Sequence, residues 1–517
     1  MKRLVYGMIF IGLMFLNPIR AAVNEILPVY HVDYQYLKLL QDRGLCLELN
    51  ALEKPYTKGQ IAQSLLNIPD TLALSKTEKE AIAYLRSDLR MEIDALQKSE
   101  SNNYIKLQTY STGFLDKMQT NEITYRGVYH LGAGLRMGKH VYIAQNYISD
   151  QYDYYDPYYS GYKWRGIAAY TQQAYINVMF NQVQFKFGRD FLQWGVGQSG
   201  TLVLSDNTIP LDQLYFNLKV GPFRFSYITA QLNSIAYKDS LGNHQANRYL
   251  AGHRLGLHLL NGRLQLAFSE IIIYGGPNSF FNFTYLNPFI FYHGAKKNGA
   301  PDNNVLPSLD VLFYPAPKWQ LYASVLIDDI QLDKKTPGDL EPNEIGWLAG
   351  SRYADPFHIN GLTLSAEYVR IANRTYKTSH PWERFSYRRK LLGYPLGNDL
   401  EYFQLEIEKW FGAKLSLRTK FSVLSKGEGN VFSAWNEPWM HYTVEQGYHE
   451  KFPSGIVEKT KTLNCFLLYN PFRWLGSSLE LHYLSISNFG HHEGQSKTDI
   501  LWRFGLTVRF NYIKNFQ

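Results

Sequence analysis

The chain has 517 residues, a formal net charge of +8 and an aromatic fraction of 15%, which includes 40 tyrosines. Its mild positive charge lacks the Lys/Arg blocks that follow a phosphate backbone, which excludes a nucleic-acid-binding protein. Its mean hydropathy is −0.29, and no apolar run after the N-terminus reaches the ~18 residues of a spanning helix, which excludes a helical membrane protein. Two cysteines, Cys46 and Cys465, are too few for a disulfide framework, and whether they pair is left open.

Residues 1–22 have the pattern of a secretory signal peptide. Lys2 and Arg3 precede an apolar stretch from Leu4 to Leu16, and Ala21–Ala22 supply small residues for cleavage. The stretch is short for a membrane span, although an uncleaved anchor is the alternative. We therefore expect an exported protein.

Residues 23–100 are expected to form a small helical domain. The segments VDYQYLKLLQDRG and QIAQSLLNI space their apolar residues as helices do, and EKEAIAYLRSDLRMEIDAL is rich in strong helix formers. A helical domain at this place would lie in the periplasm or plug the mouth of the domain formed by residues 101–517.

Residues 101–517 show a period of two instead. In the last such segment, apolar side chains occupy every even position from Ile500 to Tyr512, before a short tail, IKNFQ. This period sends alternate residues to opposite faces. A long apolar face opposite a polar one is typical of a strand between lipid and a wet lumen. Counting such segments from Tyr104 predicts an all-β transmembrane barrel of roughly 16 to 20 antiparallel strands.

Hairpin signals and loop lengths agree with a barrel. Tight turns are expected at Asn181–Gln182, Asn261–Gly262 and Gly412–Ala413. Much longer polar and aromatic connections are expected at 150–164, 331–343, 373–398 and 429–460. Short turns at one end and long loops at the other are a property of outer-membrane barrels. Glu406, Glu408 and Arg418 alternate with apolar residues, which predicts ion pairs in the lumen.

The stretch GRDFLQWGVGQSGTLVLSD, residues 188–206, contains the spacing G-x-G-x-x-G. A β-like run follows it where a dinucleotide-binding loop needs a helix, so a cofactor is not expected. His491–His492–Glu493 is interpreted as a solvated loop rather than a metal site. No spacing indicates catalytic residues. We expect the stretch to fold into the lumen, with Arg189 paired to a carboxylate such as Glu270.

Aromatic residues crowd two of the long connections. Their rings can stack on sugars while neighbouring carboxylates accept hydrogen bonds from hydroxyl groups. The alternative is an aromatic girdle at the membrane interface. The candidate glycan-binding residues are Tyr154, Tyr155, Tyr158, Tyr159, Trp164, Trp435 and Trp439.

Most of the chain resembles the Wzi-type capsule assembly proteins, with the specific motifs between residues 188 and 295. The segments that carry the resemblance are GRDFLQWGVGQSGTLVLSDNTIPLDQL, RLGLHLLNGRLQLAFSEIIIYGG and YLNPFIFYHG, and the helical start resembles a Bacteroidetes-like branch. The matching motif residues, expected to be structural, are Gly188, Arg189, Trp194, Gly195, Gly197, Ser205, Asn207, Pro210, Glu270, Asn287 and Pro288. The C-terminal third matches only as a generic barrel.

The resemblance implies an outer-membrane barrel of about eighteen strands that assists capsular or exopolysaccharide assembly or attachment. It implies a lectin-like protein that is not an enzyme. The expected partners are cell-surface polysaccharide, outer-membrane lipid and the barrel insertion machinery. A porin-like carbohydrate channel and an outer-membrane lipid or glycan hydrolase remain alternatives. The polysaccharide, the oligomeric state and whether the lumen is open or plugged are left open.

Overall fold

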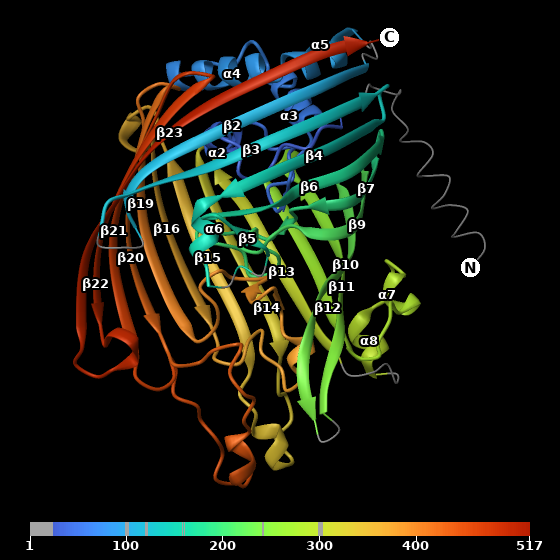
Figure 1. The fold of residues 1–517 in the computed structure, drawn as a ribbon, viewed down its shortest axis with the longest axis vertical. Coiled ribbons are helices and arrows are strands. Elements are labelled where there is room, and N and C mark those ends of the chain that lie inside the picture. Colours follow the sequence, from blue (N-terminus) through green and yellow to red (C-terminus); the bar gives the residue numbers. More distant parts are fainter. Residues whose placement is uncertain are drawn as a thin grey trace.

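The structure is a computed structural model. It describes residues 24–98, 103–118, 122–157, 159, 161–239, 242–297 and 303–516. The predicted signal peptide lies outside these ranges. Within them, 18 long antiparallel strands close into a barrel (Figure 1). The strands are β2 (Asn103–Lys117), β3 (Thr124–Met137), β4 (Val141–Asp150), β6 (Ile167–Phe180), β7 (Val183–Asp190), β9 (Leu211–Val220), β10 (Phe223–Asp239), β11 (Gly242–Leu259), β12 (Leu264–Pro277), β13 (Asn303–Ala316), β14 (Trp319–Asp329), β15 (Glu344–Ala354), β16 (Leu362–Ile371), β19 (Leu400–Trp410), β20 (Leu415–Lys426), β21 (Glu458–Phe472), β22 (Leu475–Ser487) and β23 (Ser496–Phe516).

The first and last strands close the barrel. β2 pairs with β23 from Asn103 opposite Phe516 to Lys117 opposite Trp502. The predicted alternation in β23 is confirmed, since Ile500 and Phe510 on its outer face are 63% and 60% exposed. The strand continues to Phe516. The expectation of a tail after Tyr512 is therefore wrong, because residues 513–516 keep their ladder partners in β2.

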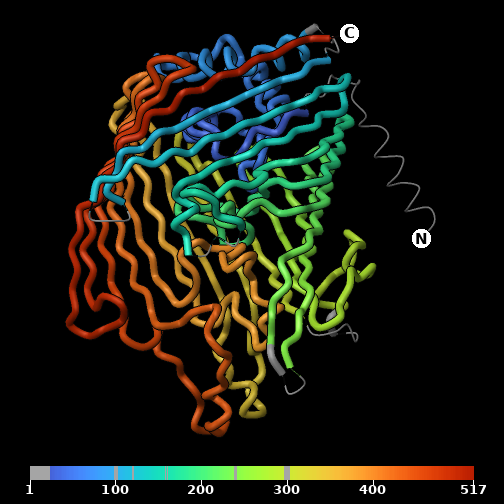
Figure 2. The backbone as a smooth tube through the Cα atoms, in the orientation of Figure 1, coloured from blue at the N-terminus to red at the C-terminus, as the bar shows by residue number. Residues whose placement is uncertain are grey.

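Short turns and long connections lie at opposite ends of the barrel (Figure 2). The short turns are built from residues that tolerate positive φ, such as Asn181 at 43° and Asn261 at 57°. Asn261 precedes Gly262, whose φ is 85°. The predicted turns at these positions are confirmed. The long connections at the other end carry the remaining short elements.

A helical domain occupies the end with the short turns (Figure 1). Its helices are α2 (Asp33–Gln41), α3 (Lys58–Leu66), α4 (Lys76–Asp88) and α5 (Arg90–Lys98). Capping boxes begin α3 at Thr57 and α4 at Ser75. The Tyr36 hydroxyl donates to the Ala413 carbonyl at 2.9 Å, which fixes α2 to the β19–β20 turn. None of the helices in the described ranges is long and apolar enough to cross a membrane.

Two segments that enter the lumen from opposite ends meet inside it. Strand β1 (Glu53–Lys54) comes from the helical domain, and β8 (Gln193–Trp194) comes from the connection between β7 and β9. They pair with each other as an antiparallel ladder. A buried apolar cluster surrounds them, with Leu52, Val203 and Leu348 among its members. The main hydrophobic core of this barrel is therefore inside its lumen.

Candidate functional site

The β7–β9 connection, which holds the glycine-rich stretch, is tied down inside the barrel. Trp194 is fully buried, and its Nε1 donates to Glu53 Oε1 at 2.8 Å. Glu53 also accepts from the hydroxyls of Tyr215 and Ser226, both at 2.8 Å. A buried carboxylate is tolerated when donors surround it in this way. The expectation that this stretch folds into the lumen is confirmed.

The glycines of this stretch serve close backbone approach. Gly197 has φ 138°, and a Cβ there would lie 1.9 Å from the Gly200 carbonyl oxygen. Gly188 has φ 127°, and a Cβ there would lie 2.2 Å from the Ala174 carbonyl oxygen. Both conformations belong to glycine. The backbone N–H of Gly195 donates to Leu52 of the helical domain at 3.0 Å.

The expected pairing of Arg189 with Glu270 is wrong. Arg189 lies within β7, opposite Asp212 of β9, and its guanidinium binds both oxygens of that carboxylate at 2.8 and 2.6 Å. Glu270 lies on β12 and accepts from the backbone N–H groups of Tyr292 and His293, both at 2.8 Å. Adjacent strands bring Asp212 to Arg189, whereas β12 is separated from β7 by three other strands of the barrel.

A small hairpin from the β16–β19 connection lies against the same stretch. Strands β17 (Ser386–Tyr387) and β18 (Lys390–Leu391) flank a turn made of Arg388 and Arg389. Both arginines have positive φ, 48° and 63°, where glycine or asparagine is usual. The hairpin is held by motif residues: Ser205 Oγ donates to the Gly393 carbonyl at 2.6 Å, and Asn207 Nδ2 to the Leu391 carbonyl at 3.1 Å.

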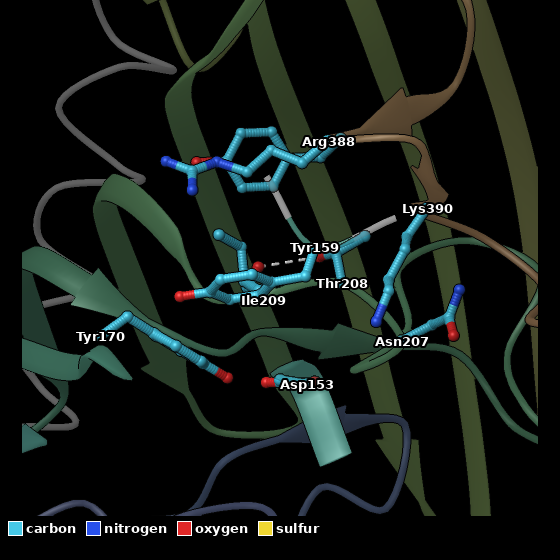
Figure 3. Close-up of a pocket in the computed structure, with 9 residues that line it drawn as sticks. Asp153, Tyr159, Tyr170, Asn207, Thr208, Ile209, Arg388 and Lys390 are labelled. Atoms are coloured by element: carbon cyan, nitrogen blue, oxygen red, sulfur yellow. Dashed lines mark hydrogen bonds between the residues drawn. The ribbon is translucent and has the colours of Figure 1, made fainter. Parts of the chain in front are cut away.

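A pocket opens where three connections meet: β4–β6, β7–β9 and β16–β19 (Figure 3). It encloses about 550 Å³, including space open to solvent. Helix α6 (Gln151–Tyr155) supplies one wall and the β17–β18 hairpin another. The lining residues are Asp153, Tyr159, Tyr170, Asn207, Thr208, Ile209, Tyr387, Arg388 and Lys390. The lining thus combines three tyrosine rings with an amide, a carboxylate and two cations.

Charges around the pocket are partly paired. Lys390 Nζ lies 2.8 Å from the carboxylate of Asp156 at the end of α6. Burial, followed by the nearby Asp150 carboxylate, raises the pKa of Asp153 to about 6. Asp150 itself caps α6, because its side chain accepts from the backbone N–H groups of Tyr152 and Asp153. Asp153 is therefore the lining residue whose charge changes between mildly acidic and neutral pH.

The predicted residues of the first aromatic connection lie in and around this pocket. Tyr159 lines it, and the Lys163 ammonium stands 5.8 Å from the Tyr159 ring and 5.7 Å from the Tyr154 ring. Tyr155 lies under the Arg126 guanidinium at 4.6 Å. Trp164, in β5 (Lys163–Trp164), is 57% exposed. Tyr158 lies outside the described residues. The glycan-binding role of these residues stays a prediction.

The second aromatic group is separate and is packed by an arginine. The Arg374 guanidinium stands 5.0 Å from the Trp435 ring and 4.4 Å from the Trp439 ring. Trp439 is only 2% exposed, so its ring contributes to the packing of the β20–β21 connection. Trp435 retains partial exposure. A sugar-binding role for this pair also stays a prediction.

Sequence reasoning missed most of the pocket. Tyr170 alternates within a strand and gives no separate signal, and Lys390 is far from Tyr159 in the chain. The hairpin could have been noticed, since SYRRKL places two turn residues between short β-like segments.

Among the described residues, one cluster has the residue types and spacing of a metal site. It consists of His31, Asp33 and Asp88 of the helical domain, whose ligand atoms lie within 4.8 Å of one another.

Comparison with known proteins identifies the family. The family model for capsule assembly protein Wzi matches residues 87–500. The structure is similar to Wzi of Escherichia coli, described as an outer-membrane, carbohydrate-binding β-barrel involved in group 1 capsule assembly, with a TM-score of 0.61, 15% identity, and 94% of this chain and 99% of that chain covered. Weaker similarity links it to two Pseudomonas aeruginosa outer membrane structures. For OpdK the TM-score is 0.46 and the identity 10%, with 80% of this chain and 99% of that chain covered. For OccD3 the TM-score is 0.43 and the identity 10%, with 79% of this chain and 91% of that chain covered.

A search of curated protein sequences finds no significant match. The family match spans most of the chain, and the barrel carries its exposed apolar residues on its outer face, as an outer-membrane protein does. The chain therefore belongs to the capsule assembly protein Wzi family and forms a β-barrel of the outer membrane.

Proposed function

We propose that this protein binds cell-surface polysaccharide in the pocket between its long connections and thereby assists capsule or exopolysaccharide assembly. In this proposal the helical domain faces the periplasm, the barrel insertion machinery places the protein in the membrane, and the protein is not an enzyme. Family membership supports the assembly role. The composition of the pocket carries the proposal for binding.

The pocket suits a saccharide chemically. Tyr159, Tyr170 and Tyr387 offer ring faces with hydroxyl groups at their tips, which suits the apolar faces and hydroxyl rims of sugar rings. Asn207 and Asp153 can accept hydrogen bonds from hydroxyl groups. Arg388 and Lys390 can donate to hydroxyls or pair with the carboxylates of an acidic polysaccharide.

The contents of the lumen argue against a diffusion channel. Arg352 binds Asp42 of the helical domain through two nitrogens, and Arg43 lies 2.7 Å from Asp355. Lys106 of β2 lies 2.7 Å from Glu25. These ion pairs are buried and join the domain to the wall, and removing one partner of such a pair is costly. A mobile plug is therefore disfavoured.

The pocket lining supports binding more than turnover. None of the nine residues drawn in Figure 3 is a histidine or cysteine, and the Thr208 hydroxyl donates to the Ile209 carbonyl at 2.9 Å. The lining therefore contains no nucleophile paired with a base.

Two measurements test the proposal. Purified protein should bind the polysaccharide of its own cell in calorimetry and should not bind neutral dextran. Deletion of the gene should release that polysaccharide into the medium while its synthesis continues. An unchanged cell-bound polysaccharide layer after deletion, together with no binding in vitro, would overturn the proposal.

A further inference from the structure

The connection between β12 and β13 leaves the barrel and packs on its outer wall (Figure 1). It contains α7 (Phe283–Leu286) and α8 (Tyr292–Lys297). Two of its side chains, Tyr285 and Tyr292, are fully buried against the wall. The wall residues in this buried cluster are Tyr249, Ala251, Ile272, Tyr274 and Val305. We call residues 278–297 the outer cap.

Register shows that this contact is on the outside. Tyr249 pairs with Tyr274, and Leu255 pairs with Phe268, on the same face of β11 and β12. Leu255 is 53% exposed. The intervening positions, including Arg254, point the other way and contact the helical domain within the lumen: Arg254 donates to the Leu52 carbonyl at 3.2 Å.

The outer cap is held in a defined position. Glu270 is fully buried on this outer face, where it accepts from the backbone N–H groups that begin α8 and lies 3.3 Å from His253 Nε2. The Tyr227 hydroxyl donates to the Tyr285 carbonyl at 2.9 Å. Asn303 Nδ2 donates to the Tyr285 hydroxyl at 2.6 Å. The cap is thus a packed element with buried polar contacts to three strands.

The opposite surface of the cap is made of exposed phenylalanines. Phe280, Phe283, Phe289 and Phe291 are 78%, 86%, 80% and 56% exposed. Each aromatic side chain can bury on the order of 150–250 Å² of apolar surface. Soluble proteins rarely expose several such side chains in one patch. The patch continues the lipid-facing wall, because Phe289 stacks on Phe225 of β10 with ring centroids 5.3 Å apart.

The height of the cap fits the apolar band of the membrane. His253 lies seven positions before Leu260, which is in the short turn at the opposite end. A tilted strand of that length rises roughly 18 Å, while the apolar band of such barrels is about 25 Å tall. Glu270 and His253 therefore lie inside the band, and Phe289, which stacks on Phe225 four positions after the turn residue Gly221, lies nearer the end with the short turns.

We propose that the outer cap is a lipid-binding element whose phenylalanines bind acyl chains of the membrane. The cap also shields Glu270 and His253, which would otherwise bring polar groups into contact with lipid. This inference does not depend on polysaccharide binding, because the cap lies outside the barrel and the pocket lies among other connections.

Spin-label accessibility tests the inference. A nitroxide label is placed through Phe283→Cys in the full chain carrying Cys46→Ser and Cys465→Ser, reconstituted in phosphatidylethanolamine–phosphatidylglycerol vesicles. Leu255→Cys on the bare wall provides the lipid control. Leu332→Cys, at an 84% exposed position in the β14–β15 connection, provides the water control. Resistance of the SDS-treated, unheated barrel to unfolding confirms that each variant is folded.

The expected result is that the label at Phe283 collides with oxygen more than with a water-soluble nickel complex, as at Leu255. A preference for the nickel complex, as at Leu332, would overturn the inference. Shielding from both reagents would also overturn it, because it would mean that a protein, such as a second copy of this chain, covers the cap.

Discussion

Single residues around the pocket are held in states that lower the stability of the fold. Arg388 and Arg389 both have positive φ in a two-residue turn, and a non-glycine residue there costs on the order of 1–3 kcal/mol. Asp153 is half-buried beside the Asp150 carboxylate, and its partial burial and that charge raise its pKa. Proteins retain such destabilising features where they position groups that bind a ligand. Replacing one of these residues should therefore change stability and binding in different ways.

Replacing Arg388 by glycine should separate strain from function. Arg388→Gly relieves the backbone and should leave the melting temperature unchanged or raise it. It also removes a charge-assisted donor worth about 1.5–3 kcal/mol, so polysaccharide affinity should fall roughly 10- to 100-fold. Calorimetry and thermal unfolding measure the two effects. Arg389→Gly, which gives the same relief without changing a pocket-lining side chain, is the matched control and should keep full affinity.

Removing one pocket ring should weaken binding without affecting the fold. Tyr159→Ala deletes a stacking surface worth about 0.5–1.5 kcal/mol, so affinity should fall roughly 2- to 10-fold. Tyr162 lies on the same connection, is 81% exposed and does not line the pocket. Tyr162→Ala should therefore bind as the natural chain does. Equal losses in both variants would contradict a role specific to the pocket.

Binding should depend on pH through Asp153. Its pKa of about 6 means that the carboxylate is charged above pH 6 and protonated below it. Because the charged form accepts stronger hydrogen bonds from hydroxyl groups, affinity should decrease as the pH falls from 7 to 5. The raised pKa also means that ionisation lowers the free energy of unfolding as the pH rises from about 4 to about 6. Calorimetry across this range should show a flatter profile for Asp153→Asn.

At the scale of elements, the β1–β8 pair links the helical domain to the β7–β9 connection. Four side-chain donors converge on Glu53, which is 7% exposed: those of Trp194, Tyr215, Ser226 and Asn50. The two strands are only two residues long, so their ladder alone holds them weakly. The carboxylate and its donors therefore fix where these segments meet.

Replacing Glu53 by alanine should loosen this junction. The change leaves Trp194, Tyr215 and Ser226 without their acceptor, at a cost of roughly 1–3 kcal/mol for each buried group. We expect a lower melting temperature and faster proteolysis of residues 190–210, read by mass spectrometry. Glu48→Gln, at an exposed position of the same domain, is the control. An unchanged proteolysis pattern in Glu53→Ala would contradict the junction.

Sequence patterns predicted local elements well and long-range contacts poorly. Alternation identified β23, and asparagines identified the turns at Asn181 and Asn261, because these signals depend only on near neighbours. The partner of Arg189 depends on which strands are adjacent and was predicted incorrectly. The pocket joins Tyr159 to Arg388 across more than two hundred residues, and no periodicity encodes such a contact. The family resemblance located the residues that hold the hairpin but left its arginines unnoticed.

The whole molecule is a wall around a packed interior. Buried ion pairs fix the helical domain at one end, and folded-in connections fill the space towards the other. This interior is a property of the complete chain, because the segments that meet in it come from opposite ends of the barrel. Whether this interior closes the lumen to ions is therefore tested on the intact protein.

The intact protein should conduct no steady current. In a planar bilayer, the chain should insert without the stable open-channel steps shown by a general porin measured in parallel. The physical reason is that moving the domain would separate Arg352 from Asp42 and Arg43 from Asp355 inside the lumen. A persistently open current would contradict this prediction and favour a carbohydrate channel.

The seam between β2 and β23 has a consequence for biogenesis. The wall becomes continuous only when the last strand of the chain reaches the first, because residues 103 and 516 are ladder partners. Both halves of the β1–β8 junction precede that last strand by hundreds of residues. In a chain synthesised from its N-terminus, the residues that fill the lumen are therefore available before the strand that closes the wall.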